Sequence, residues 1–489
     1  MNKEFNYRLV FRVMGSLAFV ESVVLLVVCL VPLFYGEDDA VYFLISSLIS
    51  LAFSGVALLL GRKPSASIGK REGSVIVTFT WIVFSFIGLL PFWLSGSIPS
   101  FTDAFFETIS GFTTTGASIL NNIEELSHGM LFWRSLTHWI GGLGIIVISL
   151  AILPVFSTSG TQLFAAETTG PTKDKIHPKI NETAKRLFII YIILTSAETV
   201  LLRIGGMGWF DAICQSFATI ATGGFSTKQA SIAYWNSPYI QYIIILFMIL
   251  SGVNFSLYYF GFKNKFEKIK ENEELRYYLL ALFVFSLIIA ISLIDFSKVN
   301  SFATFEQAWR DSLFTVSSLM TTTGFCTADY MYWKPLTWVI LLLVMLTGAS
   351  AGSTSGGIKM IRVVISAKTC YYEFKRLLHP NAVIPVRYNG HLVREDILTR
   401  VLAFTLLYLV VAGFGILVLA ISGMGFLESV GGMITCLGGV GPGLGLVGPA
   451  GNFHDIPEFS KWFLSLMMLA GRLELYTVLL LFTPAFWKR

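Results

Sequence analysis

Four short segments of the chain combine an acidic residue with a downstream glycine, and their backbone could coordinate a cation. The spacing is 13 positions in every case, between Asp103 and Gly116, Asp211 and Gly224, Asp311 and Gly324, and Glu428 and Gly441. Glycine allows the backbone conformations that would turn carbonyl groups inward. A ring of backbone carbonyls can replace the hydration shell of a cation. The four segments therefore predict the four quarters of one filter.

The residues predicted to form this filter are four consecutive positions in each segment. They are Thr114, Thr115, Gly116 and Ala117; Thr222, Gly223, Gly224 and Phe225; Thr322, Thr323, Gly324 and Phe325; and Gly439, Val440, Gly441 and Pro442. The fourth set departs most from the others, since it carries valine before its glycine and lies in a glycine-rich stretch. Alone it would indicate a flexible loop, but its register with the other three favours a filter segment.

The acidic residue that opens each segment has two interpretations. Asp and Glu suit helix starts, where they act as caps and as partners of the helix dipole. Alternatively, their carboxylates attract cations at the mouth of the pathway. We prefer the structural role.

Composition indicates a polytopic membrane protein. The chain has 489 residues, of which 54% are hydrophobic and 13% charged, and its mean hydropathy is +0.70. Soluble domains carry roughly 25% charged residues. Apolar stretches long enough to cross a bilayer recur along the chain. The filter segments, with about 10–12 apolar residues each, are too short to cross and are predicted to be re-entrant. Irregular backbone at membrane depth is tolerated only inside protein or beside water.

The predicted fold is an all-α polytopic membrane protein. Four pseudo-fourfold repeats, each a span, a pore helix, a filter and a second span, surround a central pore and follow two N-terminal transmembrane helices. The predicted units are 1–72 for the N-terminal pair, then 73–170, 171–270, 271–395 and 396–489 for the four repeats. The predicted spans are 74–95 and 129–155, 184–204 and 238–262, 276–297 and 335–365, and 397–422 and 459–486. Lys and Arg gather near both termini and at the repeat junctions, which predicts cytoplasmic N- and C-termini.

A second glycine recurs in each closing span. The four are Gly141, Gly252, Gly348 and Gly471. Small residues permit close helix packing, which is one interpretation. In the third repeat, however, the glycine opens a run of Gly, Ala, Ser and Thr that disfavours helix, and this run predicts a mobile gate. The predicted gating residues of this run are Gly348, Ser350, Gly352, Ser353, Gly356 and Gly357.

Arg472 follows the glycine of the fourth closing span directly. An arginine at the bilayer centre costs at least roughly 2.5–3.5 kcal/mol, so it should face the water path or an acid. Next to the filter it would repel cations and limit leakage. The alternative is a structural salt bridge, for which Glu198 is a candidate partner.

The junction between the third and fourth repeats is long enough to hold structure. Residues 383–393 alternate around Asn389-Gly390, which is typical of a β-hairpin. A cytoplasmic hairpin that docks a soluble partner is one interpretation. A solvated basic loop beside anionic lipid is the other.

Other chemistries find little support in the sequence. The five cysteines and six histidines show no metal-ligand spacing, and no HExxH, GxSxG or intramembrane acid pair indicates an enzyme. No GxGxxG follows a strand, so this chain is not expected to bind nucleotide itself, and no nucleic-acid partner is expected. A potassium/sodium or proton-coupled cation symporter is the alternative, although such proteins usually carry one inverted pair of repeats.

The chain resembles the Trk/Ktr/HKT superfamily of potassium transporters, and specifically its TrkH/TrkG-type membrane subunit. The resemblance spans essentially the whole chain. It rests on Thr-Thr-Gly-Ala (114–117), Thr-Gly-Gly-Phe (222–225), Thr-Thr-Gly-Phe (322–325), Gly-Val-Gly-Pro (439–442), the 348–357 run with Lys359, and Gly-Arg-Leu-Glu (471–474). The two leading spans look like the extra N-terminal pair of the Trk type.

This resemblance implies a bacterial cytoplasmic (inner) membrane protein that forms a homodimer within the lipid bilayer. It implies K⁺ as the transported ion, held at the filter residues, and adds Lys359 to the gating residues. It also implies a TrkA-like RCK-ring regulatory subunit that binds nucleotides. In the HKT branch, serine at the first filter glycine accompanies sodium selectivity, so Gly116 favours potassium. None of the four segments matches the Thr-Val-Gly-Tyr-Gly pattern of potassium channels, which implies a looser filter.

Overall fold

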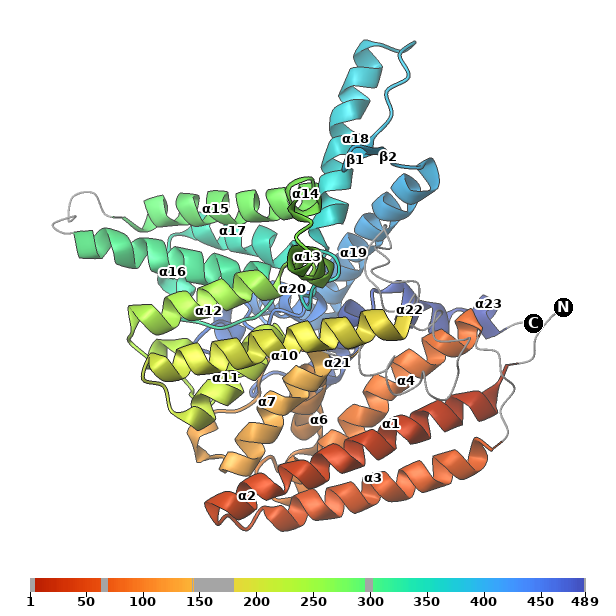
Figure 1. Cartoon of the computed structure of the whole chain (residues 1–489), viewed down its shortest axis with the longest axis vertical. Helices are drawn as coiled ribbons and strands as arrows, with labels where there is room; N and C mark the ends of the chain where they lie inside the picture. Colours follow the sequence, from red (N-terminus) through yellow and green to blue (C-terminus); the bar gives the residue numbers. More distant parts are fainter. Residues whose placement is uncertain (1–4, 63–68, 143, 145–179, 295–301, 488–489) are drawn as a thin grey trace.

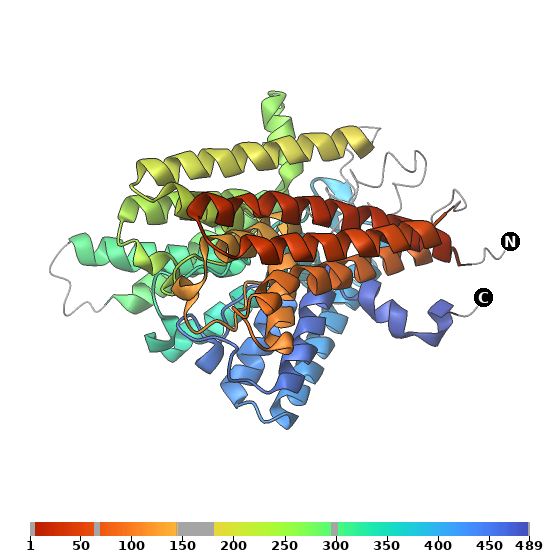
Figure 2. The ribbon, with the colours of Figure 1, turned by 90° about the horizontal axis from the view of Figure 1, so that it is seen from below.

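The chain folds almost entirely into α-helices, with the long helices running side by side (Figures 1 and 2). This computed structural model describes residues 5–62, 69–142, 144, 180–294 and 302–487. Within that part of the chain, six helices are long and apolar enough to cross a membrane, or up to eight if each of two bent helix pairs is one span. The predicted class, an all-α polytopic membrane protein, is therefore confirmed.

The N-terminal pair packs through small residues. It consists of α1 (Tyr7–Val28), α2 (Leu30–Tyr35) and α3 (Ala40–Leu60). Ser50 and Ser54 on α3 donate to the carbonyls of Ala18 and Gly15 on α1, at 2.8 and 2.7 Å. Small side chains let the helix backbones approach closely, and in lipid such packing and hydrogen bonds replace the hydrophobic effect as the driving force.

The four repeats follow in chain order. Their helices are α4 (Lys70–Gly88), α5 (Leu90–Leu94), α6 (Phe101–Phe112) and α7 (His128–Gly142); α10 (Ile180–Ile204), α11 (Trp209–Ile220), α12 (Pro238–Ser251) and α13 (Phe255–Phe262); α15 (Glu273–Leu293), α16 (Phe302–Met320), α17 (Pro335–Leu346) and α18 (Met360–Leu378); and α19 (Glu395–Ile421), α20 (Phe426–Gly438), α21 (Glu458–Arg472) and α22 (Tyr476–Leu479). Short helices α14 (Phe266–Lys270) and α23 (Pro484–Trp487) follow α13 and α22. Single 3₁₀ turns lie at Ile123–Glu125, Ser231–Tyr234, Tyr330–Tyr332, Gly445–Val447 and Leu480–Phe482.

Three of the predicted closing spans are interrupted rather than continuous. α12 and α13 meet at 94°, and α21 meets the segment that begins with α22 at 115°. The predicted spans 238–262 and 459–486 are therefore each a bent pair of helices rather than one straight helix. α17 and α18 are separated by residues 347–359, where the sequence predicts a break. The predicted span 129–155 begins as α7 but continues into 145–179, outside the described residues.

In two of the repeats, the recurring glycine of the closing span lies in close backbone contact. A Cβ added to Gly471 would clash with the carbonyl oxygen of Leu437 at the end of α20. In the first repeat, a Cβ on Gly141 would clash in the same way with Phe112 at the end of α6. In the first and fourth repeats the glycine thus lets the closing helix touch the end of a predicted pore helix, a close packing that was one of the two predicted interpretations.

The four helices predicted to be pore helices differ in how they begin. α6, α11 and α20 have 12 or 13 residues and follow Ser100, Gly208 and Gly425, respectively, whereas α16 has 19. No glycine or proline stops α16 between residues 302 and 311. Asp311 therefore lies in mid-helix, and the prediction that it begins a short helix was wrong.

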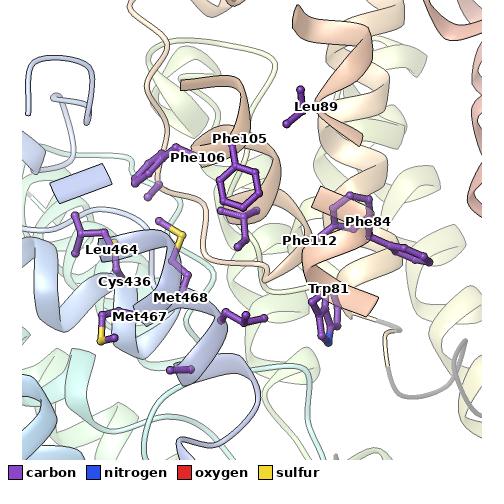
Figure 3. Close-up of a cluster of buried hydrophobic side chains, with 14 of the residues drawn as sticks. Trp81, Phe84, Leu89, Phe105, Phe106, Phe112, Cys436, Leu464, Met467 and Met468 are labelled. Atoms are coloured by element: carbon purple, nitrogen blue, oxygen red, sulfur yellow. The ribbon is translucent and has the colours of Figure 1, made fainter. Parts of the chain in front are cut away.

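The hydrophobic core joins the first repeat to the fourth (Figure 3). Phe105, Phe106 and Phe112 on α6 belong to the same buried cluster as Leu464 and Met468 on α21. This packing places α6 against α21, so the first and fourth predicted repeats are neighbours.

A small antiparallel hairpin lies beside the base of α18 (Figure 1). β1 (Arg387–Tyr388) pairs with β2 (His391–Leu392), and Asn389-Gly390 forms the turn. Both turn residues have positive φ, 48° and 75°, as a two-residue hairpin turn requires. α18 itself projects away from the other helices (Figure 1).

Candidate cation filter and its neighbouring loop

The four filter segments share an unusual backbone conformation. Two positions before each glycine, the residue is left-handed, with φ of 54° at Thr114, 54° at Thr222, 59° at Thr322 and 69° at Gly439. The glycines themselves have φ of 80°, 84°, 81° and 100°. A β-branched residue rarely adopts positive φ, and such strain gathers at functional sites. The fourth segment, which departs most in sequence, thus has the same backbone form.

The four glycines also contact one another's segments in cyclic order. A Cβ added to each would clash with the residue that precedes the glycine of the next segment. The contacts run from Gly116 to the Gly223 carbonyl, from Gly224 to the Thr323 carbonyl, from Gly324 to the Val440 carbonyl, and from Gly441 to the Thr115 carbonyl. The segments therefore form a closed ring in which four carbonyls occupy equivalent places.

A substitution at Gly439 tests whether the fourth segment shares the backbone conformation of the other three. We expect Gly439→Thr to fold and to keep cation flux, because its Cβ would meet only the Gly356 Cα, at 4.0 Å, and the other three segments carry threonine there. The left-handed φ should cost about 1–3 kcal/mol, measured as a lower thermal unfolding midpoint in detergent.

Gly441→Ala is the matched comparison, because its Cβ would lie 2.8 Å from the Thr115 carbonyl. It should lower both the flux and the potassium-over-sodium discrimination, while Gly439→Thr retains the flux. Equal flux in the two variants would contradict the ring.

An open cavity lies on one side of the ring. Its lining includes all four glycines and residues that follow them, among them Ala117, Ser226, Cys326 and Pro442. Residues that precede the glycines instead contact the 347–359 loop, as described below. The ring thus separates an open cavity from the loop.

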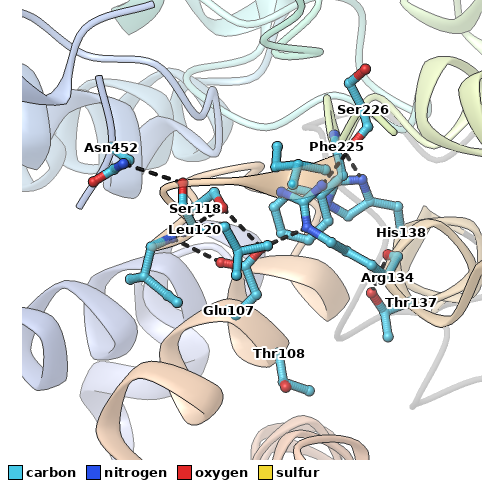
Figure 4. Close-up of polar contacts among 12 residues, drawn as sticks. Glu107, Thr108, Ser118, Leu120, Arg134, Thr137, His138, Phe225, Ser226 and Asn452 are labelled. Carbon is cyan, nitrogen blue, oxygen red and sulfur yellow. Dashed lines mark hydrogen bonds and ion pairs between the residues drawn. The ribbon is translucent and has the colours of Figure 1, made fainter. Parts of the chain in front are cut away.

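A buried ion pair joins the first filter segment to the second (Figure 4). Glu107 on α6 and Arg134 on α7 lie 2.6 Å apart, and both side chains are almost fully buried. The Arg134 guanidinium also donates to the Ser226 carbonyl at 2.8 Å and lies 3.6 Å from the centroid of the Phe225 ring. One arginine of the first repeat thereby fixes the residues that follow Gly224.

The Glu107 carboxylate also holds its own filter segment. It accepts the Ile119 N–H at 2.9 Å and the Ser118 hydroxyl at 3.0 Å. His138 stacks on the Phe225 ring with centroids 4.0 Å apart (Figure 4). These residues do not recur among the repeats, so their spacing in the sequence did not identify them. A charge inside an apolar pore helix was the available signal, since buried charges are almost always paired.

We expect Arg134→Met to destabilise the protein strongly. Removing one partner of a buried pair typically costs about 3–5 kcal/mol, because Glu107 would remain charged and buried. The thermal unfolding midpoint in detergent measures this. The double variant Glu107→Gln/Arg134→Met should lower the unfolding midpoint less than Arg134→Met alone, because no unpaired charge is then buried.

The exposed pair of Arg394 and Asp396 provides the control. Exposed pairs contribute about 0–1 kcal/mol, so Arg394→Met should barely change the midpoint. If Arg134→Met melted like Arg394→Met, the buried pair would not support the filter.

The opening acids make structural contacts. Asp103 forms a buried ion pair with Lys461 on α21. Asp211 accepts the Thr227 hydroxyl at 2.7 Å, and Glu428 accepts the Leu446 N–H at 3.2 Å. These contacts favour the structural interpretation for three of the four acids.

Residues 347–359 form a compact loop whose ends meet. The Gly348 N–H donates to the Ile358 carbonyl at 2.8 Å, and the Ile358 N–H to the Leu346 carbonyl at 3.1 Å. Gly352 and Gly357 have φ of 74° and 66°, values that residues with a side chain rarely adopt. The Ser353 hydroxyl donates to the Ser350 carbonyl at 2.6 Å.

The loop contacts elements of the other repeats next to the filter. The Ser350 N–H donates to the Gly252 carbonyl at 3.0 Å, and the Thr354 hydroxyl to the Ile220 carbonyl at 3.1 Å. The Gly356 N–H donates to the hydroxyl of the filter residue Thr322 at 2.7 Å. A Cβ on Gly356 would clash with the Gly438 carbonyl at the end of α20. The loop therefore lies among the ends of three pore helices.

Two cationic side chains hold this loop. The Arg472 guanidinium donates to the Thr354 carbonyl of the loop and to the Gly141 carbonyl of α7, both at 2.8 Å. These contacts are with carbonyls rather than with Glu198, the partner considered from sequence. Lys359 donates to the carbonyl of Ser355 and to its hydroxyl. Predicted gating residues from two repeats thus meet at one place.

Known proteins provide the comparison. A family model described as "TrkH: Cation transport protein" matches residues 40–489. The Trk system potassium uptake protein TrkH of Escherichia coli (strain K12) is 39% identical over 488 residues, 99% of this chain and 100% of the relative. Trk system potassium uptake protein TrkG of the same strain is 35% identical over 493 residues, 99% of each chain. The crystal structure of the potassium transporter TrkH from Vibrio parahaemolyticus superposes with a TM-score of 0.88 at 35% identity, covering 99% of this chain and 100% of that one.

Proposed function

Because the chain belongs to the TrkH family of cation transport proteins, we propose that it takes up potassium ions across the cytoplasmic membrane through the four-segment ring. The family is one of transporters rather than enzymes, and the relatives compared above are named for potassium uptake or potassium transport. The observation that carries the proposal is the closed cyclic contact of four left-handed turns.

The ring has the chemistry that a dehydrated cation needs. The carbonyls of Thr115, Gly223, Thr323 and Val440 occupy equivalent places in it, and carbonyl oxygens can replace water around K⁺. The C-terminal ends of α6, α11, α16 and α20 come directly before the filter segments. Helix C-termini carry partial negative charge, which adds attraction for a cation.

The 347–359 loop is the proposed gate. It lies next to the filter and touches elements of all the repeats, the first through Arg472. Arg472 and Lys359 place positive charge beside the pathway, which opposes the passage of cations. In this conformation the loop closes the pathway, and conduction requires it to move.

Partners and orientation complete the proposal. The chain functions as a homodimer with a TrkA-like RCK-ring regulator that binds nucleotides. Basic residues at the repeat junctions support cytoplasmic termini in the bacterial inner membrane. The hairpin and the projecting α18 (Figure 1) are then on the cytoplasmic side, where the regulator would reach them.

Growth of a potassium-uptake-deficient bacterium at low external potassium tests the function. The chain should restore growth, and Gly441→Ala expressed at the same level should not. Absence of rescue with normal membrane expression, together with no K⁺ flux into proteoliposomes, would contradict the proposal.

One observation favours cation symport as the second candidate. The bent pairs α12–α13 and α21–α22 are broken helices, which are typical of secondary transporters. Flux that saturates and stops when sodium or proton gradients are removed would support symport. Flux that follows the potassium gradient alone would exclude it.

A further inference from the structure

We propose that Glu273 and Glu274, at the start of α15, couple the β1–β2 hairpin to the 347–359 loop. Glu274 is the positioning residue that fastens the loop, and Glu273 fastens the hairpin. The inference rests on the proposed function, in which the loop is the gate, and it adds a route by which the hairpin acts on that gate.

Glu274 fastens the loop to the helix that follows it. Its carboxylate is buried, with the residue 2% exposed. Oε1 accepts the N–H of Ala351 in the loop at 2.7 Å and the N–H of Ile361 in the first turn of α18 at 3.0 Å. The first N–H groups of a helix lack intrahelical partners, and hydrogen bonds to an ionised carboxylate are about twice as strong as neutral ones. One oxygen thus holds both sides of the loop's exit.

Glu273 fastens the hairpin to the same helical turn. Its N–H donates to the Asn389 side-chain oxygen at 2.8 Å. Its carboxylate forms an ion pair with Lys368 on α18, and the Lys368 ammonium also donates to the Arg387 carbonyl at 3.0 Å. Arg387 of β1 and the turn residue Asn389 are therefore both tied to the first turn of α15, Arg387 through Lys368 of α18.

A shared hydrophobic cluster makes the connection stiff. Tyr388 of the hairpin belongs to the same buried cluster as Tyr278 on α15, Ile361 on α18 and Ala351 of the loop. Packed interiors transmit displacement because they are dense. Since Glu273 and Glu274 are adjacent, a shift of the hairpin moves the turn that holds the loop.

The coupling gives the projecting region a function. Figure 1 shows α18 rising away from the other helices, with the hairpin at its base near α15. A partner that binds the hairpin better in one position than in another would bias the loop by that difference in affinity. The linkage must therefore be measurable as a coupling between substitutions at the hairpin and at Glu274.

The first experiment compares Glu274→Ala with Glu274→Gln in the full chain. The Gln amide oxygen can accept both N–H groups, whereas Ala accepts neither. The two readouts are K⁺ flux into proteoliposomes and the methanethiosulfonate modification rate of a cysteine placed by Ser353→Cys. The background carries Cys370→Ser because Cys370 is exposed, and the rate of the same background without Ser353→Cys is subtracted because Cys326 lines the open cavity. We expect Glu274→Ala to raise both about fivefold or more, and Glu274→Gln to stay near the parent. Unchanged readouts in Glu274→Ala, or equal effects of Ala and Gln, would overturn the role of Glu274.

The second experiment measures the coupling. Asn389→Gly removes the acceptor but keeps the turn, because glycine tolerates the φ of 48°. We expect it to raise the modification rate about threefold or more, and to add little when combined with Glu274→Ala. Independent, multiplicative effects would overturn the coupling.

Lys375→Met is the control, because Lys375 is an exposed cation on α18, the helix that carries Lys368. This substitution should leave both readouts unchanged. The outcomes also separate the two proposals. A parent protein without K⁺ flux, but with the expected changes in modification rate, would contradict only the proposed function. A conducting parent with unchanged modification rates in the variants would contradict only the coupling.

Discussion

Gly116→Ser is expected to lower potassium-over-sodium discrimination by about tenfold or more, equivalent to about 1.4 kcal/mol. The physical reason is steric and conformational at once. Gly116 has φ of 80°, and any Cβ there would clash with the Gly223 carbonyl. That carbonyl occupies one of four equivalent places in the ring, so its displacement removes a matched ligand from one quarter. Reversal potentials, or paired K⁺ and Na⁺ fluxes in proteoliposomes, measure the change.

Gly413→Ser is the matched control for this substitution. Gly413 lies within α19, and a Cβ there meets nothing within 4 Å. Gly413→Ser introduces the same side chain into a membrane helix away from the filter. Potassium-over-sodium selectivity should therefore stay at the parent value. Unchanged reversal potentials in Gly116→Ser would contradict the assignment of this segment to the filter.

The class of fold was predictable from sequence because it depends on local patterns. Apolar stretches of bilayer length identify long helices such as α1 and α19, and Asn389-Gly390 indicates a tight turn without tertiary information. The regular spacing of the glycines located Gly439 and Gly441 although their segment differs in composition. Whether these residues coordinate K⁺ stays a prediction.

The breaks in the closing spans were predictable only where composition changes. Residues 347–359 are poor in helix formers over their whole length, whereas the α12–α13 and α21–α22 bends interrupt the apolar pattern with only a few glycine, polar or charged residues. The bend after Arg472 depends on what the helix touches, including the end of α20 beside Gly471. Propensity carries no information about such contacts.

Pairings between distant side chains were likewise outside the reach of sequence. Glu107 with Arg134 and Asp103 with Lys461 join residues 27 and 358 positions apart. A buried charged residue usually has a partner, but only the fold determines which residue that partner is. The same reasoning suggested Glu198 for Arg472, whose guanidinium instead reaches two backbone carbonyls.

Arg472→Ala is expected to raise basal potassium flux about tenfold or more. The substitution removes hydrogen bonds from the guanidinium to the Thr354 and Gly141 carbonyls, and bonds to charged groups contribute about 1.5–3 kcal/mol each. It also removes a positive charge beside the pathway. Both losses favour an open pathway, and a loss of about 1.4 kcal/mol from the closed state already changes the open-to-closed ratio tenfold. Initial rates of K⁺ entry into proteoliposomes without any regulator measure the result.

Arg472→Lys separates the two causes. Lysine keeps the charge but lacks the planar fork that reaches two carbonyls at once. Flux close to the parent would mean that charge repulsion closes the pathway, whereas flux close to Arg472→Ala would mean that the hydrogen bonds hold the loop. Shortening the 348–357 loop should raise flux in either case, because the obstruction itself is reduced. A fall in flux for Arg472→Ala at normal expression would instead give Arg472 a structural role, since then its contacts would be needed to keep the repeats assembled around the ring.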